Sequence, residues 1–213
     1  MTTRISDLRK EYSKAGLRRA DLHPDPVAQF RTWLNLAIEK EMPEPNAMTL
    51  ATVDALGLPD ARIVLLKGID ERGFHFYTNQ ESVKAAELSA NPAAALVFLW
   101  VEMERQVRVR GSVTKLNRVD TETYFATRPR GSQLGAWVSR QSSVLPDREA
   151  MERRLAELEA QYPQAVPVPP FWGGYTVKPV SLEFWQGRPN RLHDRFQYLA
   201  DTDGHWQIER LSP

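Results

Sequence analysis

The spacing of apolar residues in the first quarter of the chain predicts one helix. Apolar side chains recur there at intervals of three and four residues: Val27, Phe30, Leu34 and Ile38. Asp25 precedes this stripe as a candidate cap and Pro26 occupies the first helical position, so we expect an amphipathic helix over residues 25–40. Residues 1–24 are charged and poor in apolar groups, and we expect them to form a mobile or lightly docked arm.

Alternating apolar and polar residues predict strands in most of the remaining chain. The candidate strands are residues 47–54, 61–70, 74–79, 94–100, 105–116, 175–185, 195–199 and 205–211. Residues 105–116 alternate most clearly, because Val107, Val109 and Val113 share one face while arginines lie on the other. Helices are predicted at residues 82–89, 117–127 and 147–162, and residues 128–143, rich in Gly, Ser and Arg, are predicted to form a loop.

This order of elements predicts an α+β fold that is mostly antiparallel. Six or more antiparallel strands with a few peripheral helices are typical of a small closed or split β-barrel. Helices do not alternate with strands, which argues against a doubly wound parallel sheet. We expect residues 25–213 to form a single domain behind the arm, because 213 residues suffice for one substantial core.

Composition narrows the classes of function. Lys and Arg number 28 against 27 Asp and Glu, so the net charge of +1 gives no general attraction to nucleic acid or to an anionic membrane. The sequence has no cysteine, so redox chemistry would need a bound cofactor. The N-terminal residues lack the apolar core of a secretory signal, and we expect a soluble cytoplasmic protein. The four histidines lack metal-ligand spacing, so no metal site is expected.

Two groups of polar residues are candidate anion sites. Tyr77-Thr78-Asn79 is followed by Ser82 and Lys84 at a predicted helix start, where backbone N–H groups and a lysine favour anions, although helix capping alone also uses such residues. Helical spacing brings Tyr124 close to Arg128, with Ser132 following; a solvated helix end is the alternative.

The segment RIVLLK, residues 62–67, has a cation at each end of an apolar run. Regular strand alternation would place Arg62 and Lys67 on opposite faces, so they could grip one phosphate only if the strand were bent or the ligand lay across its end. A barrel strand with charged ends is an equally good interpretation.

The segment FWQGRPNRLHDRF, residues 184–196, contains the run Arg191, His193 and Arg195. If this run is a strand, the three side chains share one cationic face. Two guanidinium groups beside an imidazole disfavour its protonation and suit a planar anion, whereas a basic face on an edge strand is the plainer interpretation.

These segments, with ERQVRVRG, YFATRPRGSQLGAWVSRQSS and PPFWGGY, resemble in order the pyridoxamine 5′-phosphate oxidase family from about Arg9 to Arg210-Leu211. The resemblance implies an FMN-binding split-barrel homodimer whose sites lie at the interface. It implies FMN contacts from these residues: Arg62, Ile63, Val64, Leu65, Leu66, Lys67, Tyr77, Thr78, Lys84, Gln106, Gln141, Ser142, Trp185 and Arg195. It implies substrate contacts from these: Arg9, Lys10, Glu11, Tyr12, Lys67, Tyr124, Arg128, Ser132, Arg191, Leu192 and His193.

The resemblance also implies the reaction. The expected activity is oxidation of pyridoxamine or pyridoxine 5′-phosphate by dioxygen to pyridoxal 5′-phosphate, with hydrogen peroxide as product and ammonia released from the amine. Arg191 and His193 are the expected catalytic residues, and residues 9–12 are expected to close as a lid. The family commonly has Arg-Lys where this chain has Val83-Lys84, which is expected to weaken FMN binding.

Three alternatives stay open. A related split-barrel flavoprotein would keep the FMN residues but act on another substrate. A non-catalytic protein would bind or store the vitamer or the flavin. Arg18, Arg19 and Arg210 could form an additional phosphate site for product feedback, although a solvated basic surface is the simpler interpretation.

Overall fold

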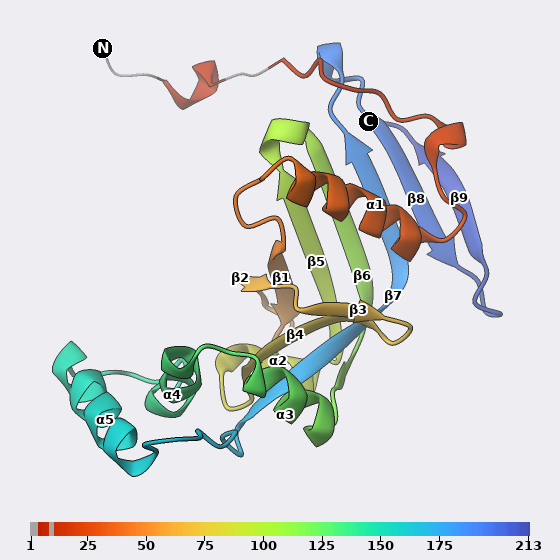
Figure 1. Ribbon diagram of the computed structural model, residues 1–213. Helices are drawn as coiled ribbons and strands as arrows, with labels where there is room; N and C mark the ends of the chain where they lie inside the picture. The colour runs from red at the N-terminus through yellow and green to blue at the C-terminus, as the bar shows by residue number, and fades with distance from the viewer. Residues whose placement is uncertain (1–3, 9–10) are drawn as a thin grey trace. The chain divides into compact units, whose positions relative to one another are not determined.

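The computed structural model describes residues 4–8 and 11–213 (Figure 1). The chain divides into two compact units. The first unit comprises Met1–Thr49, Ala95–Arg110 and Pro179–Pro213, and the second comprises Leu50–Ala94 and Gly111–Lys178. Arg9 and Lys10, which were expected to contact substrate, lie outside the described residues.

The described strands form one nine-stranded antiparallel sheet. The strand order is β2-β1-β5-β6-β7-β4-β3, with β8 paired to β7 and β9 paired to β8. Four strands divide their residues between the units: β1 (Ala47–Val53), β5 (Ala93–Trp100), β6 (Arg105–Lys115) and β7 (Trp172–Gln186). In β6 the predicted alternation is confirmed, with every second residue from Val107 to Val113 buried.

The first unit packs α1 (Pro26–Glu39) against its strands. The Asp25 carboxylate accepts a hydrogen bond from Val27 N at 2.9 Å, so the predicted cap is confirmed. The buried face of α1 carries Phe30, whose ring lies 4.7 Å from that of Phe98, and Trp33, whose ring lies 5.2 Å from that of Phe184. The strands β8 (Asp194–Ala200) and β9 (Trp206–Leu211) complete this unit, together with short 3₁₀ turns at Ile5–Asp7, Arg19–Asp21, Val101–Met103 and Pro189–Arg191.

The second unit combines three short strands with four helices. Its elements are β2 (Pro59–Leu65), β3 (Gly68–Asp70), β4 (Gly73–Asn79), α2 (Val83–Ala90), α3 (Arg118–Ala126), α4 (Arg130–Val138) and α5 (Arg148–Gln161). Strand β4 pairs with β7, and Tyr77 lies opposite Gly174. A Cβ atom on Gly174 would lie 2.7 Å from the Tyr77 ring, so this position accepts no side chain without a shift of that ring.

Two local predictions are wrong. Residues 130–138, expected to be part of a loop, form α4, because Leu134 is buried in a core cluster with Phe125, Leu158, Val166 and Trp172. That burial outweighs the low helix propensity of Gly131 and Gly135. The segment 61–70, expected to be one strand, is divided into β2 and β3.

The condition set for residues 191–195, that they form a strand, is not met. They are not a continuous strand, because Asn190 and Arg191 have positive φ values of 56° and 62° and belong to a 3₁₀ turn that begins at Pro189. Of the three basic residues only Arg195 lies in a strand, β8.

The other predicted helices and strands are found with boundaries shifted by a few residues. Across the described residues, no helix is long and apolar enough to cross a membrane.

Candidate active site

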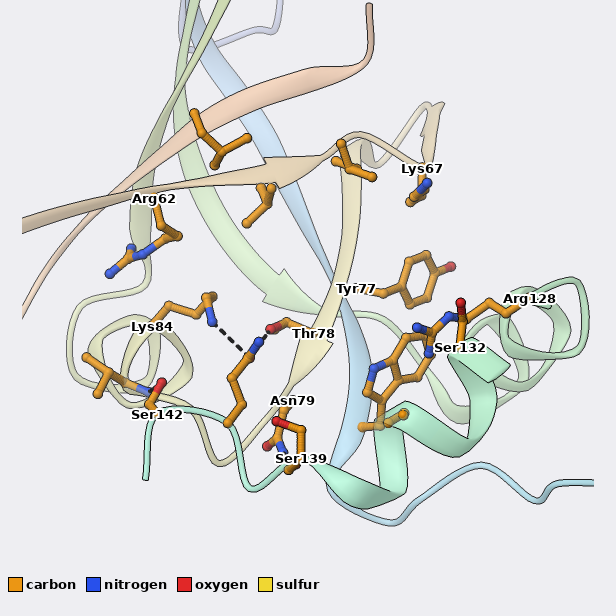
Figure 2. Close-up of a pocket in the computed structure, with 18 of the residues that line it drawn as sticks. Arg62, Lys67, Tyr77, Thr78, Asn79, Lys84, Arg128, Ser132, Ser139 and Ser142 are labelled. Atoms are coloured by element: carbon orange, nitrogen blue, oxygen red, sulfur yellow. Dashed lines mark hydrogen bonds between the residues drawn. The ribbon is translucent and has the colours of Figure 1, made fainter. Parts of the chain in front are cut away.

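The second unit contains a cavity of about 730 Å³ (Figure 2). Its wall is built by β2 and the residues that follow it, the end of β4, the start of α2, the facing parts of α3 and α4, and the loop after α4. Most of the residues of this unit that were expected to bind ligands line it: Arg62, Ile63, Val64, Leu65, Lys67, Tyr77, Thr78, Lys84, Tyr124, Arg128, Ser132, Gln141 and Ser142. Leu66 differs, because its side chain belongs to the buried core.

The break between β2 and β3 lets both ends of RIVLLK line the same cavity. Strand β2 ends at Leu65, and Lys67 N donates a hydrogen bond to His75 O at 2.8 Å instead of continuing the strand. Arg62 and Lys67 both lie in the cavity wall (Figure 2). The strict alternation that would separate the two cations therefore does not apply.

Polar groups converge at the start of α2. Gln141 Oε1 accepts hydrogen bonds from Lys84 Nζ at 3.0 Å and from Thr78 Oγ1 at 2.9 Å (Figure 2). Lys84 is buried, and desolvation lowers the pKa of its ammonium group, with the positive charge of Arg62 as the second cause. A partly desolvated lysine beside a helix N-terminus is suited to bind an anion such as phosphate.

The loop after α4 approaches the same helix start. Ser142 has a φ of 71°, and its Oγ accepts a hydrogen bond from Val83 N at 3.3 Å. A positive φ at a residue other than glycine costs on the order of 1–3 kcal/mol and often marks functional sites. Ser82 is fully buried; its Oγ donates to Asn79 O at 2.7 Å and accepts a hydrogen bond from Lys84 Nζ at 3.2 Å, so this hydroxyl stabilises the turn and helps to position Lys84.

Three residues that the sequence did not single out hold Arg62. Its Nη2 lies 2.8 Å from Glu87 Oε2 and 2.6 Å from Asp60 Oδ2, and its Nη1 donates to Thr52 Oγ1. Glu87 is 6% exposed and also accepts a hydrogen bond from Thr52. The sequence offered one signal for this network. Glu87 is an acidic residue next to Leu88, on the face of the helix that is buried.

A second group of residues surrounds Arg128. The rings of Tyr77 and Tyr124 stack with centroids 4.1 Å apart, and the Arg128 guanidinium lies 4.7 Å from the centre of the Trp172 ring. Arg128 Nη1 is buried and has no hydrogen-bond partner among the described residues. Desolvation lowers the pKa of Arg128, although an arginine stays charged at neutral pH. A half-buried guanidinium with one buried, unpaired donor makes this end of the cavity suited to an anionic ligand.

The first unit holds the remaining site residues. The rings of Trp185 and His193 lie 4.6 Å apart, and Tyr12 meets both edge-on at 5.6 and 5.7 Å respectively. Arg195 Nε donates to Glu183 Oε1 at 2.8 Å, so this guanidinium already has a carboxylate partner. Gln106 is half-buried on β6, whereas Glu11, Arg191 and Leu192 are exposed.

The environment of His193 favours its neutral form. Desolvation lowers the pKa of this imidazole, and the charge of Arg191 lowers it further, as the basic run predicted. His193 Nδ1 accepts a hydrogen bond from Arg188 N at 3.1 Å, which leaves Nε2 as the donor of the neutral ring. Arg195 is not a cause of this shift.

The candidate feedback residues show a different pattern. Arg18 and Arg210 line a hollow of about 470 Å³ in the first unit, together with Arg188, Asp21 and Asp194. Arg18 pairs with Asp21, and Arg210 pairs with Asp194. Arg19 does not line this hollow.

The described residues contain no cluster of three or more His, Cys, Asp or Glu side chains that could hold a metal ion.

Two parts of the sequence match known families. Residues 34–162 match the family described as pyridoxamine 5′-phosphate oxidase, and residues 172–213 match the pyridoxine 5′-phosphate oxidase C-terminal dimerisation region. The chain belongs to the pyridoxamine 5′-phosphate oxidase family. Membership in this family indicates an oxidoreductase with a flavin cofactor.

Relatives in the pyridoxamine 5′-phosphate oxidase family match over nearly their whole length. A pyridoxine/pyridoxamine 5′-phosphate oxidase from Cupriavidus necator is 54% identical over 211 residues, covering 99% of this chain and 100% of the relative. A protein of the same name from Cyanothece sp. (strain PCC 7425) is 55% identical over 214 residues, covering 100% of both chains.

Solved structures confirm the predicted split-barrel fold. PhzG from Burkholderia lata, solved with tetrahydrophenazine-1-carboxylic acid, has a TM-score of 0.89 at 30% identity and covers 96% of this chain and 100% of its own. A pyridoxamine 5′-phosphate oxidase-related, FMN-binding protein from Nostoc punctiforme has a TM-score of 0.72 at 18% identity, covering 86% and 97% of the two chains.

Proposed function

We propose that this protein oxidises pyridoxamine 5′-phosphate and pyridoxine 5′-phosphate to pyridoxal 5′-phosphate, using FMN and dioxygen. Dioxygen is reduced to hydrogen peroxide, and with the amine substrate water hydrolyses the resulting imine to the aldehyde and ammonia. The observation that carries the proposal is one cavity with basic side chains at two places, Arg62 and Lys84 at one and Arg128 at the other. Two such groups suit two phosphorylated ligands, a cofactor and a substrate.

The residues at the start of α2 fit the phosphate group of FMN. Lys84, Thr78 and Ser142 offer donors there, and Arg62 adds a guanidinium that Glu87 and Asp60 hold in the wall. Gln141 bridges Lys84 and Thr78. Each charge-assisted hydrogen bond to a phosphate contributes about 1.5–3 kcal/mol to binding. Bound FMN supplies the two-electron acceptor for the reaction.

The residues around Arg128 fit the phosphate group of the substrate. Arg128 has a buried donor without a partner, and Tyr124, Ser132 and Lys67 line the same cavity. The stack of Arg128 on Trp172 limits the positions of the guanidinium, so less conformational entropy is lost on binding. This group of residues would fix one end of the substrate and thereby orient the carbon that is oxidised.

We assign Arg191 and His193 to the pyridine ring of the substrate. His193 would donate a hydrogen bond from Nε2, since its Nδ1 accepts one from the backbone. Arg191 would position the ring and, through its charge, keep the imidazole neutral. In this tautomer the Nδ1 lone pair is taken by the Arg188 N–H group, so the neutral ring would act on the substrate as a hydrogen-bond donor through Nε2 and not as a general base.

We further propose that the active form is a homodimer in which residues of both chains complete each site. The match of residues 172–213 to a dimerisation region supports this assembly. Arg195 and Trp185, assigned to the flavin ring, fall within the matched region, as do Arg191 and His193.

PhzG supplies a specific alternative, because it shares the fold at 30% identity and was solved with a tricyclic carboxylic acid. A protein with that type of substrate would need the flavin residues but no phosphate site around Arg128. Oxygen consumption measured with pyridoxamine 5′-phosphate, pyridoxamine and tetrahydrophenazine-1-carboxylic acid separates the two functions. We expect oxidation of the phosphorylated vitamer to be the most efficient by kcat/KM.

Purification provides the first test of the proposal. We expect a yellow protein with the absorbance spectrum of bound flavin, or one that takes up added FMN. A protein that stays colourless with excess FMN, or that consumes no oxygen with any of these substrates, contradicts the proposed function.

A further inference from the structure

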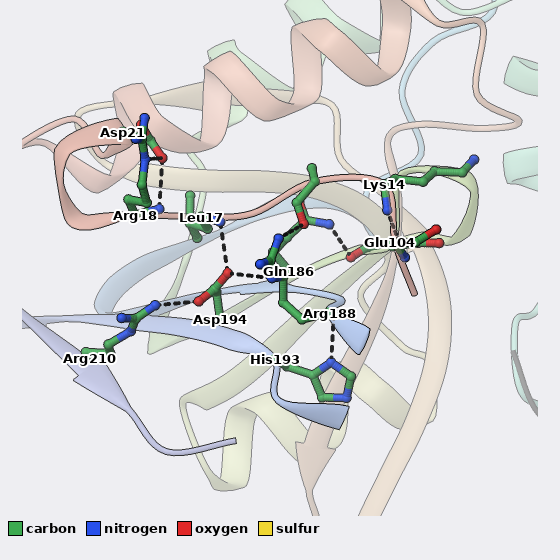
Figure 3. Close-up of polar contacts among 12 residues, drawn as sticks. Lys14, Leu17, Arg18, Asp21, Glu104, Gln186, Arg188, His193, Asp194 and Arg210 are labelled. Carbon is green, nitrogen blue, oxygen red and sulfur yellow. Dashed lines mark hydrogen bonds and ion pairs between the residues drawn. The ribbon is translucent and has the colours of Figure 1, made fainter. Parts of the chain in front are cut away.

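The arm before α1 is attached to the first unit through a buried carboxylate. Glu104 Oε2 accepts hydrogen bonds from the backbone N–H groups of Ser13 and Lys14, both at 3.0 Å (Figure 3). Glu104 is 3% exposed, and the only polar partners its side chain has among the described residues are these two amides. A buried carboxylate is costly unless it is hydrogen-bonded, so the arm and Glu104 stabilise each other.

A second carboxylate holds the arm a few residues further on. Asp194 Oδ2 accepts a hydrogen bond from Leu17 N at 3.0 Å, and the Leu17 side chain is 3% exposed (Figure 3). Asp194 also pairs with Arg210, and with Arg188 at 3.5 Å. These pairs fix the carboxylate that receives the arm. The arm is thus held at two points by side chains from distant parts of the sequence.

Glu104 connects this attachment to the end of β7. Its backbone C=O accepts hydrogen bonds from Gly187 N at 2.8 Å and from Gln186 Nε2 at 3.1 Å. Its own backbone adopts the left-handed conformation, with φ of 55°. In this conformation the carboxylate of Glu104 contacts the arm, and its backbone carbonyl contacts the residues that follow Trp185.

The attached arm carries Tyr12 to the aromatic pair of the first unit. The Tyr12 ring packs edge-on against both Trp185 and His193. Gly187 makes this approach possible, because a Cβ atom at this position would lie 2.7 Å from Tyr12 Cγ. The position of Tyr12 therefore depends on two features. Gly187 has no side chain that would clash with the ring, and Glu104 holds the backbone that follows Tyr12.

We propose that Glu104, with Asp194 as a second anchor, is a positioning residue that docks the arm and so holds Tyr12 against Trp185 and His193. Its link to catalysis rests on the proposed function, because there His193 contacts the substrate. Docking itself does not depend on that assignment. Without the two carboxylate contacts, the arm would separate more often from this surface, and the Tyr12 edge of the site would open.

Limited trypsin digestion of the full-length, FMN-loaded protein without substrate tests docking. Cleavage after Lys14 reports the fraction of molecules with a detached arm, because docked backbone resists the protease. We expect Glu104→Gln to accelerate this cleavage about tenfold, the equivalent of one lost charge-assisted hydrogen bond. Glu102→Gln is the matched control, because Glu102 is exposed and only its backbone carbonyl contacts the arm. Equal cleavage rates for Glu104→Gln and wild type overturn the proposal.

A double-mutant cycle gives a second test that does not alter the buried carboxylate. Gly187→Ala places a methyl group against Tyr12 Cγ and should accelerate cleavage after Lys14. In a Tyr12→Ala background the same substitution should have no further effect, because the ring that it meets is gone. Additive effects of the two substitutions on the cleavage rate would show that Gly187 does not act through Tyr12, and would overturn the proposal.

Steady-state kinetics then test the consequence for the site. Glu104→Gln should raise the KM for pyridoxamine 5′-phosphate severalfold, whereas the FMN content and the thermal midpoint of unfolding stay close to those of Glu102→Gln. If cleavage accelerates while KM is unchanged, the positioning role is overturned. If no variant, wild type included, oxidises a B6 vitamer, the proposed function fails, whereas the digestion result stands by itself.

Discussion

The guanidinium of Arg62 is held 2.8 Å from the carboxylate of Glu87, which is almost fully buried. Asp60 contacts the same guanidinium at 2.6 Å. Among the described residues at this end of the cavity, the charges of Arg62 and Lys84 are thus offset by two carboxylates. Fixed geometry, more than excess positive charge, is what this end offers to a phosphate group.

Replacing Arg62 should therefore mainly release the flavin. We expect Arg62→Ala to weaken FMN binding by about tenfold to a hundredfold, as the loss of charge-assisted hydrogen bonds predicts. Fluorescence quenching of FMN during titration of the apoprotein measures this affinity. Arg148→Ala is the matched control, because Arg148 pairs with Glu152 on the exposed face of α5. Unchanged FMN affinity in Arg62→Ala contradicts the assigned role of Arg62.

A second prediction concerns Val83, where the resemblance described above led us to expect an arginine. Val83 is 49% exposed, lines the cavity and precedes Lys84 at the start of α2. A cation added there would exceed the local carboxylate charge, so we expect Val83→Arg to bind FMN about tenfold more tightly. The gain should shrink as salt is raised, because exposed charges are screened.

Val83→Gln separates charge from side-chain length at this position. It adds a long polar side chain without a charge and should leave FMN affinity within about twofold of wild type, a change of under half a kcal/mol. If Val83→Gln tightens binding as much as Val83→Arg does, charge is not the cause.

The third prediction concerns the buried donor of Arg128. We expect Arg128→Met to raise the KM for pyridoxamine 5′-phosphate about a hundredfold, because the substrate phosphate loses its guanidinium partner. The kinetics of unphosphorylated pyridoxamine should change little. Arg148→Met, on the exposed face of α5, serves as the control. Equal losses for the phosphorylated and unphosphorylated substrates would contradict a phosphate site at Arg128.

Periodicity predicted the elements whose burial follows a local pattern. The spacing of three and four gave α1 together with its Asp25 cap, although the buried face runs through Phe30, Trp33 and Ala37 and Ile38 is 54% exposed. The alternation from Val107 to Val113 gave β6. In both elements the residues that decide the structure are neighbours in the sequence. Most of the ligand-binding residues predicted for the second unit also line one cavity, because they belong to short segments that the fold brings together.

Long-range contacts account for the predictions that failed. Helix α4 depends on the burial of Leu134 with Leu158 and Trp172, which lie far along the chain. The carboxylates of Glu87, Glu104 and Asp194 were not recognised, because their partners are 25, 90 and 177 residues away. The pattern of residues within one segment does not show which distant residue a carboxylate contacts.

Local backbone chemistry decides the structure of residues 189–195. The run from Arg191 to Arg195 alternates as a strand would, but Pro189 precedes it and Asn190 has a positive φ. Asparagine adopts this conformation more readily than most residues, and a proline before it favours a turn. The Pro-Asn dipeptide was therefore a better guide to this segment than the alternation of its charges.

The last prediction concerns the titration of His193. Desolvation, followed by the charge of Arg191, holds the pKa of the imidazole below its ordinary value of about 6.5. The folded protein therefore binds fewer protons at this ring than the unfolded chain does. The stability that follows from this is present above the unfolded pKa and is lost as the pH falls towards the folded pKa.

Arg191→Met removes the smaller of the two causes. We expect the pKa of His193 to rise in this variant but to stay below the ordinary value, since desolvation remains. NMR titration of the His193 ring protons measures both values, and Arg108→Met, which removes an arginine paired with Glu183, should leave them unchanged. The acidic limb of the pH profile of kcat/KM should shift upwards with the imidazole if His193 must be neutral for catalysis. An acidic limb that stays fixed while the NMR pKa moves would show that catalysis does not require the neutral state of His193.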